Sequence, residues 1–138
     1  MIREIGLFGG AVLLAAAPLL WQTAPPAKDA AFSVPADLAT KTNPVHPTAA
    51  GLAQAKKMYG WDCAMCHGKD GAGNGDMASQ LKAKLKDYRD PATLKGMTDG
   101  ELFYIIQKGK GEMTGEGERA KPEEIWNMVS LVRSFSKK

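Results

Sequence analysis

The chain is 138 residues long, 24% of them charged, and its formal net charge is +3 when both histidines are neutral. This length allows one domain with short extensions. The lysines are accompanied by neither a nucleic-acid-binding motif nor interleaved aromatic residues, which argues against a nucleic-acid partner. Two cysteines and two histidines are present. One of the histidines, His46, lacks the paired spacing of a structural zinc site, so zinc is disfavoured.

The N-terminal segment predicts export. An apolar run from Ile5 to Leu20 follows the positive charge of Arg3, as in a signal peptide. Proline directly follows the small residues at both candidate cleavage sites, so a retained membrane anchor formed by residues 5–21 stays open as well. We therefore expect residues 1–21 to be a signal peptide or an N-terminal anchor. Either way, the rest of the chain is expected in the periplasm, soluble or anchored to the membrane.

Residues 22–47 are rich in proline and alanine and show little apolar periodicity. This composition is typical of a linker or an extended arm, in which we expect His46 to be an exposed loop residue. The globular domain is then expected to cover residues 48–138. Its first helix is predicted at Ala50–Tyr59, with Thr48 as the N-cap.

A five-residue motif follows this helix, which Gly60 is expected to end. The motif is Cys63-Ala64-Met65-Cys66-His67. Cys-x-x-Cys-His is the attachment signal of c-type haem, in which two thiols add to neighbouring vinyl groups and the adjacent histidine takes the iron. A thioredoxin-like dithiol is disfavoured because no βαβ pattern surrounds the cysteines. We predict one covalent haem c attached through Cys63 and Cys66, with His67 as an iron ligand.

Two weakly patterned segments come next. Gly68–Gly75 contains four glycines and predicts a loop whose backbone can turn tightly beside the porphyrin. Asp76–Tyr88 has apolar residues at helical spacing, but the pattern is weak. Asp90 and Pro91 then predict a turn.

The C-terminal part predicts two further helices. A capping box that begins at Thr98 starts one of them, and Gly109 is expected to end it. The last helix is predicted to have Pro122 at its first position and an apolar stripe made of Ile125, Met128, Val129, Val132 and Phe135. No segment shows the alternation of a strand, so the predicted fold class is all-α.

The second axial ligand of the iron decides between a carrier and an open-site enzyme. Met97 and Met113 are the two candidates, since the other methionines lie in predicted helices or too close to His67. Met97 directly precedes the capping box, where an apolar residue commonly packs back as a hydrophobic staple. Met113 stands alone in a polar, glycine-rich loop, and iron would explain its presence there. We favour Met113 over Met97 and over an iron without methionine, and His/Met ligation raises the potential of c-type haem.

These residues resemble the class I cytochromes c, over roughly Ala50 to Phe135. The resemblance covers Cys-x-x-Cys-His after a first helix, the glycine-rich stretch, Thr-Asp-Gly-Glu-Leu before a helix and Gly-x-Met before the last one. It implies a cytochrome c fold with three to five short helices wrapped around one covalently bound haem. We expect an N-terminal apolar helix and an extended linker to precede this domain. It also implies Met113 as the distal ligand, and crossed first and last helices in which the residues that face each other are Ala55, Tyr59, Met128 and Leu131.

The sequence departs from that family's pattern at three places. Thr114 follows the methionine where proline is usual, and Ala55 stands where a glycine often allows a close helix crossing. No proline follows His67 closely to supply the carbonyl that often accepts the imidazole Nδ1–H.

We interpret the chain as a monohaem electron carrier of a respiratory or photosynthetic chain, and not as an enzyme. Two alternatives remain: a haem c subunit of a larger oxidoreductase complex, and an open-site, peroxidase-like haem enzyme. The expected partners are redox proteins, whose acidic surfaces could dock on a lysine-rich patch. We refer to this set as the lysine patch: Lys82, Lys84, Lys86, Lys95, Lys108 and Lys110.

Overall fold

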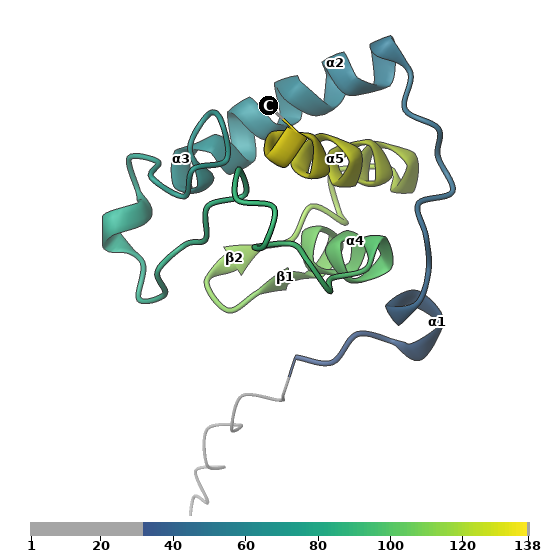
Figure 1. Ribbon diagram of the computed structural model, residues 1–138, viewed down its shortest axis with the longest axis horizontal. Helices are drawn as coiled ribbons and strands as arrows, with labels where there is room; N and C mark the ends of the chain where they lie inside the picture. The colour runs from purple at the N-terminus through teal and green to yellow at the C-terminus, as the bar shows by residue number, and fades with distance from the viewer. Residues whose placement is uncertain (1–31, 138) are drawn as a thin grey trace, which may run out of the picture. The chain divides into compact units, whose positions relative to one another are not determined.

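Three helices form the centre of the domain in the computed structural model, which describes residues 32–137. They are α2 (Ala49–Met58), α4 (Asp99–Lys108) and α5 (Pro122–Ser134). Helix α5 packs against both α2 and α4 (Figure 1). The all-α prediction is therefore confirmed. The helices enclose one core of buried apolar side chains, among them Ala55, Met58, Tyr59, Leu102, Phe103, Ile106, Ile125, Trp126, Met128, Val129, Leu131, Val132 and Phe135.

The predicted helix starts are confirmed by their caps. The Thr48 hydroxyl accepts a hydrogen bond from the Gly51 N–H at 3.0 Å. Thr98 and Glu101 form the reciprocal capping box, with both bonds present. Pro122 is the first residue of α5, where its missing N–H costs no hydrogen bond.

Gly60 does not end the first helix, so that prediction is wrong. The chain continues helically through η1, a π-helix over Tyr59–Cys63, and α3 (Ala64–His67). The residue that ends this run is Gly68, whose φ of 78° is a left-handed value that favours glycine. The haem motif is therefore part of a continuous helical run.

The weak helical pattern over Asp76–Tyr88 is also misleading. The only helix in that segment is the short 3-10 helix η2 (Ala78–Gln80), and the rest consists of turns, bends and irregular chain. The described residues also include one small antiparallel hairpin, in which β1 (Gly109–Lys110) pairs with β2 (Met113–Thr114). This two-residue pairing is too short to produce an alternating pattern in the sequence.

Part of the proline-rich stretch packs on the helices. It forms the short helix α1 (Ala36–Ala39), which contacts α4. The Asn43 side chain donates to the Trp126 carbonyl and the Ser130 hydroxyl, both at 2.9 Å. His46 is exposed, as predicted. The predicted signal or anchor, residues 1–21, lies outside the described residues.

Helices α2 and α5 approach closely where small residues of α2 meet α5. Ala55 is only 1% exposed. One turn earlier, a Cβ on Gly51 would lie 2.9 Å from the side chain of Asn127. The close approach therefore depends on Gly51. This glycine lies one turn before Ala55, the position at which the family often has a glycine.

Candidate functional site

The candidate site begins with the two cysteines, which are half-buried and are not joined to each other. Cys63 ends η1 and Cys66 lies in α3. Burial raises the pKa of the Cys63 thiol to about 12, and the negative charges of Glu116 and Asp62 raise it further. A reactive redox dithiol needs a lowered pKa. The environment of Cys63 therefore argues against the thioredoxin-like alternative.

The glycine-rich loop closes the end of α3. Helix ends leave backbone carbonyls without partners, and here loop N–H groups supply them. Gly73 N–H donates to the His67 carbonyl at 2.8 Å, and Gly75 N–H donates to the Cys66 carbonyl at 3.0 Å. A Cβ on Gly75 would lie 2.6 Å from the Ala64 carbonyl oxygen. The glycines are thus needed for a close approach to the motif's own backbone.

His67 is held beneath an aromatic ring. Its imidazole stacks on Tyr88, with ring centroids 5.2 Å apart and an interplanar angle of 23°. Tyr88 is placed by its N–H, which donates to the Gly71 carbonyl at 2.7 Å. The next residue, Arg89, forms an ion pair with Asp70 of the loop, with Nη1 and Oδ2 2.9 Å apart. This role of Tyr88 was not predicted from the sequence, in which Tyr88 only ends a segment with a weak helical pattern.

One imidazole nitrogen has no protein partner in the described part of the chain. Nδ1 of His67 is buried there without a hydrogen bond, and burial lowers the pKa of the ring. A neutral imidazole is the form that binds metals. No hydrogen-bond acceptor for Nδ1 lies within reach among residues 32–137, and the sequence has no proline closely after His67 to supply a carbonyl.

Met113 lies in the β-hairpin, half-buried and packed against the core. Met97 also packs against the core, and its carbonyl accepts a hydrogen bond from Arg133 Nη2 at 2.5 Å. The segment that carries Met97 is thereby fixed to α5. The loop that carries Met113 has a polar contact near its tip, where the Lys82 N–H donates to Glu112 at 2.9 Å.

These groups fit a covalent haem c. Two free thiols stand one helical turn apart, burial favours the neutral form of the imidazole that directly follows them, and a methionine side chain lies half-buried in a glycine-rich loop. This is the donor set that c-type attachment and His/Met ligation need. A further ion pair near the site, made by Arg119 with Asp62 and Glu116, left no signal in the sequence pattern.

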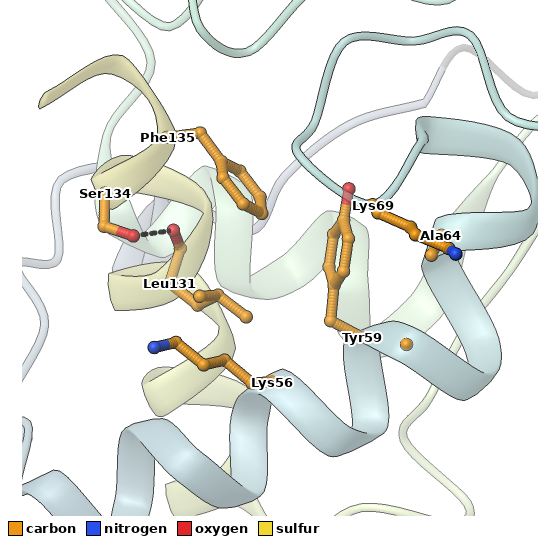
Figure 2. A pocket seen from close by; sticks show the side chains of 8 residues that line it. Lys56, Tyr59, Ala64, Lys69, Leu131, Ser134 and Phe135 are labelled. Atoms are coloured by element: carbon orange, nitrogen blue, oxygen red, sulfur yellow. Dashed lines mark hydrogen bonds between the residues drawn. The ribbon is translucent and has the colours of Figure 1, made fainter. Parts of the chain in front are cut away.

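A groove lies beside the haem motif. It has a volume of about 440 Å³ and lies between the end of α2 and α5, with Tyr59, Leu131 and Phe135 among its lining residues (Figure 2). Lys56 and Lys69 line it as well. Ala64 of the haem motif lines the groove too, whereas Cys63, Cys66 and His67 do not.

Comparisons with known proteins concern the family of the chain. Residues 50–132 match the family described as cytochrome C oxidase, cbb3-type, subunit III. The chain is 31% identical over 104 residues to "Cytochrome c6, chloroplastic" of Chlamydomonas reinhardtii, a match that covers 74% of this chain and 66% of that relative. The chain thus spans slightly less than two thirds of that relative's length.

Two solved structures are similar to the described fold. The KustC0563 c-type cytochrome has a TM-score of 0.52 and 30% identity, with 59% of this chain and 95% of that chain covered. The second belongs to the Kuenenia stuttgartiensis reducing HAO-like protein complex Kustc0457/Kustc0458. It has a TM-score of 0.60 at 24% identity, with 67% of this chain and 46% of that chain covered. This second likeness supports the fold alone.

Proposed function

Because the chain belongs to the c-type cytochromes, of the class I monohaem kind that binds one covalent haem c, we propose that it carries single electrons between redox partners of a respiratory or photosynthetic chain. When bound, the haem supplies one-electron exchange at its iron. The protein's residues hold it, orient it and limit the access of water. No substrate chemistry is assigned to them.

In this proposal Cys63 and Cys66 would hold the porphyrin through thioether bonds, and His67 and Met113 would bind its iron. The observation that carries it is the placement of His67, whose ring stacks on Tyr88 and directly follows two half-buried thiols that are not joined to each other. An imidazole held in this way, with its ring orientation set by Tyr88, suits a permanent ligand better than a proton shuttle.

The partners are proposed to be redox proteins with acidic surfaces. All six residues of the lysine patch are exposed, which permits electrostatic steering of such a partner. The apolar run at the start of the chain supports export to the periplasm. Among the described residues, no helix is both long and apolar enough to cross a bilayer. The proposed anchor or signal, residues 5–21, lies outside the described residues.

A second candidate function is a haem c subunit of a larger oxidoreductase. The specific observation in its favour is the matched family, which is described as an oxidase subunit. Under this alternative the same residues would bind the haem, and the protein would pass electrons within a complex. Co-purification from the native membrane or periplasm separates a subunit from a free carrier.

The purified haem-loaded protein tests the carrier function directly. A redox titration followed by its visible spectrum should fit a single one-electron step. The oxidised form should show the long-wavelength charge-transfer band of a methionine-ligated iron, and the reduced form should fail to bind CO. Ready CO binding, or turnover of peroxide, would favour the open-site enzyme. Loss of the pigment in acid acetone would contradict covalent attachment.

A further inference from the structure

Arg119 joins two segments that are far apart in the sequence. Its Nη1 donates to Oδ1 of Asp62 at 3.0 Å, across 57 positions. Its Nη2 donates to both carboxylate oxygens of Glu116, each at 2.9 Å. Asp62 directly precedes Cys63 in η1, and Glu116 follows Met113 by three residues. The guanidinium therefore links the haem-attachment segment to the end of the methionine loop.

Glu116 is anchored and buried. It is 5% exposed, and its N–H donates to the Ile106 carbonyl of α4 at 2.8 Å. A buried carboxylate is costly unless a paired charge and hydrogen bonds compensate for the lost water. Arg119 supplies both. The side chain of Arg119 is 58% exposed, and that of Asp62 is 24% exposed. The contact of Arg119 with Asp62 therefore lies nearer to solvent than its contact with Glu116.

We propose that Arg119 is a positioning residue that holds the methionine loop against the haem-attachment helix and thereby keeps Met113 on the iron. This inference rests on the proposed function, in which Met113 is the distal ligand. A thioether is a neutral side chain on a glycine-rich loop, so the freedom of the loop opposes its retention. A tie between the loop's end and η1 reduces that freedom.

The chemistry of arginine suits this role. Its planar guanidinium contacts two carboxylates at the same time and keeps its charge at any pH that the protein meets. The neighbouring carboxylates raise the pKa of Arg119 further. A lysine would present a single ammonium group and is expected to replace only part of the bridge.

The test is a titration of the oxidised, haem-loaded protein with imidazole, which competes with methionine for the iron. Binding is followed by loss of the charge-transfer band. Arg119→Gln leaves Glu116 buried and unpaired, and should raise the apparent imidazole association constant about tenfold. Asp62→Ala leaves the pair of Arg119 and Glu116 intact, and should raise the constant about two- to fivefold. Arg119→Lys should fall between the wild type and Arg119→Gln.

Arg133 offers a control outside the proposed site. Its guanidinium pairs with Asp99 of α4 at 2.9 Å and donates to the carbonyl oxygens of Leu94 and Met97. Arg133→Gln should therefore leave imidazole binding at the wild-type value. The denaturation midpoint of each variant is measured in parallel. A loss of stability in Arg119→Gln without a gain in imidazole affinity contradicts the positioning role.

The outcomes separate this inference from the proposed function. If the oxidised wild type lacks the charge-transfer band, the Met113 assignment fails and the positioning role falls with it. If the wild type has the band but Arg119→Gln and Asp62→Ala bind imidazole as the wild type does, only the positioning role is wrong. Should Arg119→Gln not fold, Asp62→Ala decides the question by itself.

Discussion

The imidazole of His67 and the phenol ring of Tyr88 are stacked, with their centroids 5.2 Å apart. Tyr88 therefore covers the ring whose Nδ1 atom has no hydrogen-bond partner among the described residues. Hydrogen bonds to a ligating imidazole and access of water to it both tune a bound iron. The contact links a loop residue to the electronic properties of the site.

Removing this ring should lower the reduction potential. In Tyr88→Ala, water can reach Nδ1–H and accept its proton in a hydrogen bond, which makes the imidazole a stronger donor and favours Fe(III). The free energy of unfolding should fall by about 2 kcal/mol, since a partly buried large side chain is truncated. Spectroelectrochemistry measures the first effect and urea denaturation the second. Tyr88→Phe keeps the ring and should keep the wild-type potential; an equal drop in both variants would contradict the role of stacking.

The two candidate methionines predict opposite results for the same substitution. Met113→Ala should lower the reduction potential, remove the charge-transfer band of the oxidised protein and allow CO to bind the reduced form, because the iron loses its thioether ligand. Met97→Ala should change none of these properties. Visible spectra of the two variants suffice. The assignment is wrong if the Met97 variant shows the changes while the Met113 variant keeps the native spectrum.

Two glycines predict stability changes of opposite sign. Gly60 lies within η1, and a Cβ there would meet nothing within 4 Å, so Gly60→Ala should stabilise the fold by about 0.5–1 kcal/mol. At Gly100, a Cβ would overlap the backbone carbonyl of Leu38. Gly100→Ala should therefore destabilise the fold by about 1–3 kcal/mol. Thermal denaturation of both variants checks the signs, and a stabilised Gly100→Ala would contradict the close approach of α1 to α4.

The pH dependence can be tested at Asp87. Hydrogen bonds from Arg89 hold the pKa of this carboxyl below its ordinary value of 3.8. Because the folded-state pKa is the lower one, the stabilising contribution is present above pH 3.8 and is lost as the pH falls through the folded-state value. Arg89→Gln should return the Asp87 pKa toward 3.8, as measured by carboxyl-carbon NMR. Lys95→Gln removes a positive charge elsewhere and should leave that titration unchanged.

Several features could be predicted from local sequence because local chemistry determines them. The caps at Thr48 and Thr98 satisfy N–H groups within their own first turns, so a few residues suffice to identify them. The spacing of Cys63, Cys66 and His67 is likewise short-range, which is why the family and the covalent haem followed from it. The apolar stripe of α5 identified a core helix before any partner helix was known.

What the tertiary structure alone decided depends on contacts between distant segments. Its local sequence predicts that Gly60 ends the helix, yet in the structure the helical run continues through Gly60 to Gly68. Tyr88 reaches His67 only because its backbone docks on the glycine-rich loop. Arg119 meets Asp62 across 57 positions, a pairing that no local spacing can encode. Periodicity and capping act over a few residues, whereas the surroundings of the ligands depend on which segments the fold brings together.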